Sequence, residues 1–450
     1  MVMVDTYDKK AFYRTIWALA TPIVLQNMIT IGVNMMDTFM LGSYGEIQLS
    51  GSSLAIEFVN IFHILCMGMG SGAAVLTAQR WGSGDIAGLK RVVTIMLRCC
   101  IAIASFFTLA SLAWPNELMR IFTSDPAIIE KGAMYYRIHS PAFLFMGLSL
   151  TLTMVMRSVR LVNIPLIGSI VTFFVNIFFN WVFIFGKLGA PEMQIGGAAL
   201  GTVIARVVEA ALIGGYFLLV DKRVGYRIRD LFRSCKDEIS NYVRFSMPVL
   251  VSDLLLALGN SAVAIVMGHM GAAFVAANAI ISQIVRLSTV FNQGISNASG
   301  TMTGNTLGQG KMQTAYRQGV SFLRISVAVG LLAALLILVI SPLIVEAYNL
   351  AEETRHIAMQ LMYAVSIMVV FQAVQSVLTK GVLRGGGDTR FLMVADVAFL
   401  WLASVPLGYL AAHVFNLPAF WVYLALKIDW AIKAIWCTFR LKGEKWMRIV

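Results

Sequence analysis

Charged residues are scarce in this chain of 450 residues, because Asp, Glu, Lys and Arg make up only 13% of it. A soluble domain has about 25%. Hydrophobic residues reach 58%, and the formal charge of +12 comes from basic residues that lie between long apolar runs. Membrane topology and anionic lipid headgroups account for basic residues in such places better than nucleic acid does. The composition therefore predicts a protein of the lipid bilayer with no nucleic-acid partner.

The sequence also lacks the motifs of covalent chemistry. It has no Walker lysine loop, no HExxH motif and no Ser-His-Asp grouping, so ATP does not drive the chain directly. The five cysteines show no metal-ligand spacing. The glycine-rich GGGDT at 385–389 has no P-loop lysine after it. We therefore expect neither an enzyme nor a cofactor.

An internal repeat is what the chain does have. Sliding the first half along the second brings Pro22 onto Pro248 and Asn34 onto Asn260 without a gap. Helix breakers and loop residues recur, whereas the apolar residues between them differ. A half-chain repeat in membrane-spanning sequence is typical of secondary transporters. Further matched pairs are Gly42 and Gly268, Gly45 and Gly271, Gly68 and Gly294, Thr77 and Thr303, Gly82 and Gly308, Gly84 and Gly310, and Arg91 and Arg317.

Twelve apolar segments are long enough to cross the hydrocarbon core, which takes about 20 residues. With six spans per half, an even number, the halves share one orientation and are related by an axis along the membrane normal. The predicted fold is an all-α membrane protein of twelve transmembrane helices in two pseudo-symmetric six-helix lobes, residues 1–219 and 243–450, joined by a cytoplasmic linker, 220–242. The spans lie near 15–40, 53–79, 92–113, 134–156, 163–186, 197–219, 243–267, 275–305, 319–341, 358–381, 391–412 and 418–438.

Basic residues predict the orientation. They are concentrated in the 220–242 loop and in alternate shorter loops, whereas the other loops carry few basic residues and several acids, such as Glu117 and Glu352. By the positive-inside rule, both termini are cytoplasmic. We expect a multi-pass protein of the cell membrane.

Polar groups within the spans are the functional candidates, because a carboxylate at the bilayer centre costs about 2.5–3.5 kcal/mol. Asp37 has no basic residue one helical turn away, so it is either a protonatable site or hydrogen-bonded to another helix. Asn176 and Asn180 lie one turn apart on span 5 and share a face. They can satisfy Asp37, coordinate a cation, or simply join two helices. Thr202 begins span 6 among small residues, and its alternative is a bond to its own helix.

The second half places its charges differently. Asp253, early in span 7, is an acid without a helical partner, and the repeat pairs it with Asn27 rather than with Asp37. Glu57 in span 2 pairs with Gln283 and either lines a cavity or lies at the lipid edge.

The remaining polar residues of the spans divide into two groups. Asn34 and Asn260, which the repeat brings together, are further cavity candidates. Ion pairs within one helix are expected for Glu209 with Arg206 and for Asp429 with Lys433. Asp396, which lies near Arg390 at the end of span 11, is expected to have a structural role.

Several motifs, in this order and spacing, make the chain resemble the multidrug and toxic compound extrusion (MATE) family over nearly its whole length. They are MDTFMLGSYG in span 1, the run from GMGSG to TAQRWGSGD after span 2, NIFFNWVFIFGKLGAPEMQIGGAALGT across spans 5 and 6, and then MGHMG, GNTLGQGK and GVLRGGGDT. The resemblance implies two lobes around a central cavity, cycled by alternating access and driven by inward H⁺ or Na⁺.

The resemblance also implies roles for individual residues. Asp37 matches the family's span 1 acid, Asn176 and Asn180 its span 5 polar pair, and Thr202 its span 6 threonine. Some members have aspartate at the position of Asn180, so the pocket here has one acid.

A second implied site, for a cation in the C-lobe, is incomplete. Asp253 resembles the family's span 7 acid, but the span 10 aspartate is missing. Gln372 and Gln375 stand in that region, and Gln283 is a further candidate.

We therefore expect a monomeric secondary antiporter that exports cationic or amphipathic drugs or metabolites. H⁺ is favoured as the coupling ion because Asp37 alone suffices for it, whereas Na⁺ would need further oxygens around Asp37 or Asp253. The alternative is a flippase of lipid-linked precursors, which would need a cavity lined with arginine and lysine. A receptor or scaffold that transports nothing would show neither buried acids nor a repeat.

Overall fold

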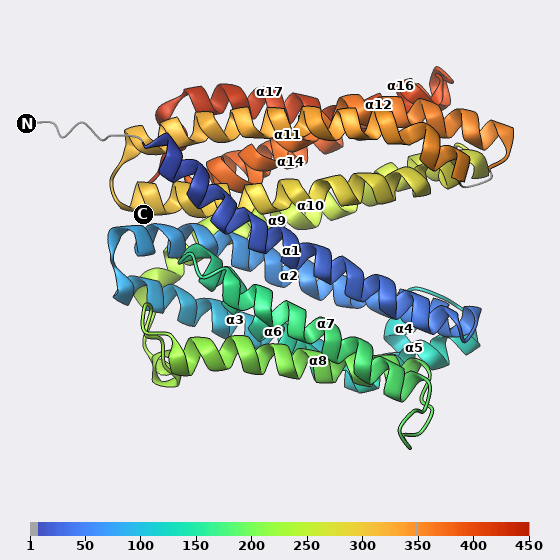
Figure 1. Ribbon diagram of the computed structural model, residues 1–450, viewed down its shortest axis with the longest axis horizontal. Coiled ribbons are helices and arrows are strands. Elements are labelled where there is room, and N and C mark those ends of the chain that lie inside the picture. The colour runs from blue at the N-terminus through green and yellow to red at the C-terminus, as the bar shows by residue number, and fades with distance from the viewer. Residues whose placement is uncertain (1–7, 348–349, 450) are drawn as a thin grey trace, which may run out of the picture. The chain divides into compact units, whose positions relative to one another are not determined.

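The computed structural model describes residues 8–347 and 350–449, which contain helices and no strand (Figure 1). The helices of the first half are α1 (Lys9–Gly42), α2 (Glu46–Ser83), α3 (Ile86–Ala113), α4 (Pro115–Arg120), α5 (Pro126–His139), α6 (Ala142–Ser158), α7 (Asn163–Ile184), α8 (Ile195–Gly215), η1 (Tyr216–Val220) and η2 (Ile228–Phe232). Those of the second half are α9 (Lys236–Gly268), α10 (Ala272–Gly308), α11 (Met312–Ala347), α12 (Glu352–Val377), η3 (Leu378–Val382), α13 (Leu383–Gly385), α14 (Thr389–Phe399), η4 (Leu400–Ser404), α15 (Val405–Tyr409), η5 (Leu410–Val414), α16 (Ala419–Leu426), α17 (Ile428–Lys442) and η6 (Glu444–Trp446).

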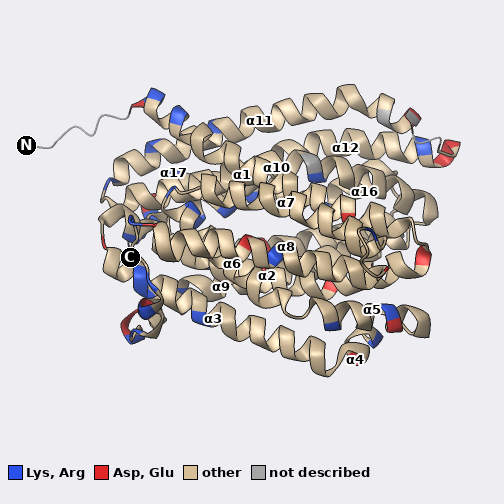
Figure 2. Ribbon diagram, turned by 60° about the horizontal axis from the view of Figure 1, so that its bottom comes forward, with Lys and Arg blue, Asp and Glu red and all other residues tan. Residues whose placement is uncertain are grey.

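The helices account for the predicted spans. Within the described ranges, 10 helices are long and apolar enough to cross a membrane, and α5 with α6, bent by 59°, makes 11. The predicted span at 418–438 corresponds to α16 and α17, which are separated at Lys427. Figure 2 shows these helices as largely uncharged, with most basic and acidic residues at helix ends and in connections. The prediction of a helical multi-pass membrane protein is confirmed.

The repeat has a structural counterpart in the turns between helices. Gly45 and Gly271 have φ of 116° and 98°, and both precede the second helix of their half. Gly84 and Gly310 have φ of 77° and 75° in the next turn of each half. This backbone region favours glycine. The residues that recur along the chain are therefore those that shape equivalent turns.

The chain folds into two compact units. The N-unit comprises residues 25–77 and 85–246, and the C-unit comprises residues 8–24, 78–84 and 247–449. Three helices, α1, α2 and α9, contribute residues to both units. The predicted lobes, 1–219 and 243–450, are defined by the repeat rather than by contacts and remain a prediction.

Each unit has its own core. In the N-unit, α7 packs along α8, while α6 contacts both α3 and α8. An aromatic cluster of Phe58, Phe62, Phe107 and Phe143 fills the space between α2, α3 and α6. In the C-unit, α12 is central and packs against α10, α11, α16 and α17. Both cores are built from side chains that touch neighbouring helices, which leaves other apolar side chains exposed.

Candidate functional site

Asp37 lies in the second half of α1 and is hydrogen-bonded to another helix. The side-chain amide of Asn180, on α7, donates to Asp37 Oδ1 at 2.5 Å. Asn180 is completely buried, while Asp37 is partly exposed. The predicted contact between the span 1 acid and the span 5 carboxamides is therefore present in the N-unit.

The contact continues as a chain of polar side chains. Asn180 Nδ2 also donates to Asn176 Oδ1 at 3.2 Å, and Asn176 Nδ2 donates to Thr202 Oγ1 at 3.5 Å. Thr202 donates in turn to the carbonyl of Ala198 at 2.9 Å, so the local bond expected for this threonine is also present. The four candidates of the N-half thus form one connected group.

Close packing of α7 on α8 brings this group together. A Cβ at Gly201 would overlap the side-chain oxygen of Asn180, and a Cβ at Gly197 would overlap the backbone of Phe183. Glycine at these two positions of GGAALGT lets the two helices approach. The Oδ1 atom of Asn180 has no hydrogen-bond partner among the described residues. It is a buried acceptor that a water or a cation could use.

Two further residues, Arg206 and Tyr135, interact electrostatically with Asp37 and were not singled out for function from the sequence. Arg206 lies one turn after Thr202 on α8 and interacts electrostatically with Asp37, His139 and Tyr135. Its expected ion pair with Glu209 is also present, at 2.7 Å. The i, i+4 spacing of Thr202 and Arg206 was the available signal, because it places both on one face of α8.

His139 is the most isolated polar group in this region. It is 2% exposed, and neither ring nitrogen has a hydrogen-bond partner within the described part of the chain. Its ring stacks on Tyr135, with centroids 5.1 Å apart. No sequence pattern pointed to His139, because its position depends on how α5 packs against α8.

The candidates of the C-half do not gather into one site. Asp253 has a partner that the sequence did not indicate, because Arg384 Nη2 lies 3.9 Å from its Oδ1. Gln372 accepts from Asn292 at 2.9 Å, and Gln375 accepts from Thr379 of η3 through its backbone carbonyl at 2.8 Å and its side-chain oxygen at 3.5 Å. In the part of the chain that the structure describes, neither glutamine is hydrogen-bonded to Asp253.

Buried charges of the C-unit form a separate network. Lys433 Nζ lies 2.9 Å from Asp429 Oδ2, as expected from their spacing, and 3.5 Å from Asp396 Oδ1. Asp396 was expected near Arg390, but it pairs with Lys433 because α14 packs against α17. Ser404 donates to Asp429 at 2.8 Å and Ser252 donates to Asp396 at 3.2 Å. The ammonium of Lys433 thus lies between two carboxylates.

The secondary candidates are exposed. Glu57, Asn34, Asn260 and Gln283 all have exposed side chains. The carbonyl of Asn34 accepts from Thr38, a bond within α1. Their proposed place in a cavity stays a prediction.

Comparison with known proteins supports a single family. The family model described as MatE matches residues 22–182 and 248–410, one match in each half, and the two matches begin at the paired residues Pro22 and Pro248. A probable multidrug resistance protein NorM from Mesorhizobium japonicum is 27% identical over 447 residues, which cover 97% of this chain and 93% of the relative. A probable multidrug resistance protein NorM from Thermotoga maritima is 25% identical over 417 residues, covering 91% and 88%.

Solved structures share the fold. A crystal structure of MATE in the bent conformation has a TM-score of 0.87 at 18% identity and covers 96% of both chains. A multidrug resistance MATE family transporter of the MOP superfamily, in an outward-facing conformation, has a TM-score of 0.86 at 19% identity, covering 96% of this chain and 97% of that one.

Proposed function

This chain belongs to the MatE family, whose members are transporters, and from that premise we propose that it is a secondary active efflux antiporter. It exports cationic or amphipathic small molecules in exchange for inward-moving H⁺. The main observation behind the proposal is the hydrogen bond from Asn180 to Asp37. It joins a carboxylate of α1 to a polar side chain of α7 within the helical N-unit.

The surroundings of Asp37 suit a group that alternates between two charge states. Low-polarity surroundings disfavour an ionised carboxylate, whereas the Asn180 donor and the charge of Arg206 stabilise it. A carboxyl balanced in this way can take up a proton from one side of the membrane and release it to the other. Asp37 is therefore the proposed coupling residue, with Asn180, Asn176 and Thr202 as its polar support.

Two features favour H⁺ over Na⁺. A hard cation needs several oxygen ligands, and only Asp37 supplies an anionic oxygen in this group. In the C-unit, the ammonium of Lys433 lies between the carboxylates of Asp396 and Asp429, in the position that a metal ion bound by both acids would take.

Cationic cargo is favoured over a lipid pyrophosphate by the way two arginines within the helices of the N-unit are used. Arg157 donates to Gln26 Oε1 at 2.6 Å, and Arg206 donates to Glu209 at 2.7 Å. A flippase of lipid-linked precursors would need guanidinium groups free to bind phosphate. The names of the NorM relatives, as multidrug resistance proteins, support drug-like substrates.

Reconstituted transport tests the proposal. Purified protein in Na⁺-free proteoliposomes should move a fluorescent organic cation when a pH gradient is imposed. Asp37→Asn should abolish this transport, because the amide keeps the shape but does not titrate. Glu117→Gln, at an exposed acid of α4, is the matched control and should retain the full rate.

Two outcomes would reject parts of the proposal. Transport that requires a Na⁺ gradient would exclude H⁺ coupling and make Asp37, Asn176 and Asn180 a coordination shell. A normal pH-driven rate in Asp37→Asn, with wild-type amounts of protein in the vesicles, would exclude Asp37 as the coupling residue.

A further inference from the structure

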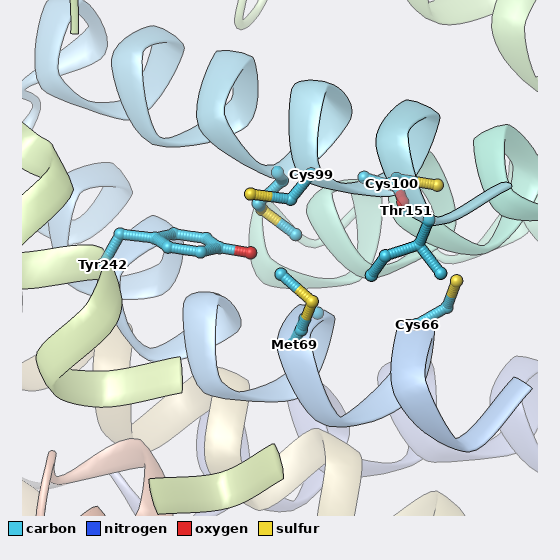
Figure 3. A pocket seen from close by; sticks show the side chains of 9 residues that line it. Cys66, Met69, Cys99, Cys100, Thr151 and Tyr242 are labelled. Atoms are coloured by element: carbon cyan, nitrogen blue, oxygen red, sulfur yellow. The ribbon is translucent and has the colours of Figure 1, made fainter. Parts of the chain in front are cut away.

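A small cavity in the N-unit is lined by sulfur atoms and lies outside the proposed coupling group (Figure 3). Cys66 and Met69 of α2 line the cavity on one side. Met96, Cys99 and Cys100 of α3 line it on the other. In Figure 3, the sulfur atoms of α2 and α3 face the space between these two helices, and Tyr242 extends toward Cys99. Five of the nine lining residues are cysteine or methionine, and none is a carboxylate.

Two of the thiols border the cavity from neighbouring helices. Cys66 of α2 and Cys100 of α3 both line it, together with Thr151 of α6 (Figure 3). Both thiols are buried, whereas Cys99 lies on the side of the cavity near Tyr242. The cavity thus brings two buried sulfur donors from separate helices to one space.

We propose that this cavity is a binding site for a soft monovalent cation, Cu(I) or Ag(I), held by the sulfur atoms of Cys66 and Cys100 with thioether support from Met69 and Met96. Thiolate and thioether ligands select such ions, whereas Na⁺, Mg²⁺ and Ca²⁺ prefer oxygen. No group of three or more His, Cys, Asp or Glu ligands exists among the described residues, so Zn²⁺, which takes four ligands, does not fit. Two sulfurs are enough for a two-coordinate Cu(I) or Ag(I).

Charge balance is compatible with burial. When M⁺ binds, Cys100 releases its proton to water and forms the metal–sulfur bond, while Cys66 stays a thiol and donates a lone pair. The metal ion brings one positive charge and the released proton removes one, so the site remains neutral. A neutral complex avoids the large cost of an unpaired charge in an apolar unit.

The exposure of the ligands provides an entry route. Met69 is partly exposed, whereas Cys66 and Cys100 are 8% and 6% exposed. An ion can therefore pass from the thioether of Met69 to the inner pair. Methionine side chains are flexible enough to follow it. Once bound, the metal would link α2 to α3, and by binding only the folded state it would raise thermal stability.

Metal binding to the full-length protein in detergent tests this site. The variant Cys235→Ala/Cys437→Ala removes the two cysteines outside the cavity and should bind one Ag(I) per chain, measured by mass spectrometry of the metal after desalting. Adding Cys66→Ser or Cys100→Ser should lower the affinity at least about tenfold, because an oxygen is a poor ligand for a soft ion. Cys99→Ser is the matched control and should retain the metal.

X-ray absorption of the loaded Cys235→Ala/Cys437→Ala protein supplies a measurement that does not depend on the folding of the serine variants. Two or more sulfur scatterers around the metal are expected, and a shell of oxygen or nitrogen would overturn the proposal. Binding unchanged by both Cys66→Ser and Cys100→Ser would show adventitious binding elsewhere. A reduced protein that binds no Ag(I) would overturn the proposal as well.

Discussion

At the scale of single residues, the environment of Asp37 shows how one amide changes a site. Asn180 donates to Asp37 and leaves its own oxygen, Oδ1, without a partner in the described structure. An aspartate at this position would replace a donor with a second acceptor. The identity of residue 180 therefore decides the charge of the group, which is one carboxylate here.

Asn180→Asp is predicted to make transport respond to Na⁺. Two carboxylates this close cannot both ionise without a cation between them, so the pair will either share a proton or bind a metal ion. We expect the rate at pH 8 to rise with added Na⁺, whereas the wild type should be insensitive. Uptake of a fluorescent cation at several Na⁺ concentrations measures this. If the variant shows no Na⁺ dependence, residue 180 lies outside the ion's coordination shell.

Lys433→Met is predicted to destabilise the protein through the C-unit. The change leaves Asp396 and Asp429 buried without their shared cation, and breaking a buried ion pair in this way costs about 3–5 kcal/mol. The apparent melting temperature in detergent should fall clearly. Adding Asp396→Asn and Asp429→Asn should recover part of the loss, because no uncompensated charge remains. A triple variant as unstable as Lys433→Met would show that packing of the lysine stem, not charge, matters.

At the scale of helices, the approach of α7 to α8 creates the polar group. Gly197 and Gly201 lie where any larger side chain would meet α7. Helices in membranes pack closely through small residues, and polar side chains then hydrogen-bond across the contact. Asn176 and Asn180 can reach both Asp37 and Thr202 only because of this contact.

Gly201→Val is predicted to impair both folding and transport. Its side chain would displace Asn180 from Asp37, and overpacking of this kind costs about 1–3 kcal/mol. Gly215→Val is the matched control on the same helix, because a Cβ at Gly215 meets nothing within 4 Å. Melting temperature and pH-driven uptake should change only for Gly201→Val. Similar losses in both variants would point to a general effect of valine in α8.

Hydropathy along the sequence did not predict several features of the helices. The helix at the predicted span 134–156 is bent by 59° between α5 and α6, where Ser140 and Pro141 interrupt it. Three π-helical segments, η3, η4 and η5, interrupt the helices that cover the predicted spans 358–381 and 391–412. Only η4 and η5 have a proline nearby, Pro406. Packing against neighbouring helices sets such local changes, and hydropathy does not report them.

At the scale of the whole molecule, the repeat and the all-helical membrane fold were readable from the sequence. Pairs such as Gly45 and Gly271 mark turns that glycine must make, so they survive where apolar side chains vary. The contact of Asp37 with Asn180 was also expected. We did not expect the contact between Asp396 and Lys433, which lie on helices distant in the sequence. Nothing in the local sequence specifies such contacts.

The connection between the two halves is anchored to α3. Lys90 Nζ lies 3.2 Å from Asp230 Oδ2, and Arg98 donates to the carbonyls of Leu231 and Arg233. Burial disfavours ionised Asp230, but the backbone amide of Arg227 and the ammonium of Lys90 outweigh it, so its pKa lies below the usual value. A folded pKa below the unfolded one stabilises the docked connection at neutral pH, and this stabilisation is lost as the pH falls through the folded pKa.

The orientation of the whole chain is testable at this connection. The helix α9 begins at Lys236, within the predicted linker 220–242, so only the part of the linker before Lys236 is a true connection.

Asp230 is buried and paired, which makes it unsuitable for labelling, whereas Arg229 beside it is exposed. In a variant whose native cysteines are removed, Arg229→Cys should resist a membrane-impermeant maleimide in intact cells and react after permeabilisation, because the basic residues of this segment predict a cytoplasmic position for it. Glu117→Cys, in a predicted external loop, should react in intact cells and is the matched control. The reverse pattern would invert the predicted topology, and with it the direction in which Asp37 must load and release its proton for the chain to act as an exporter.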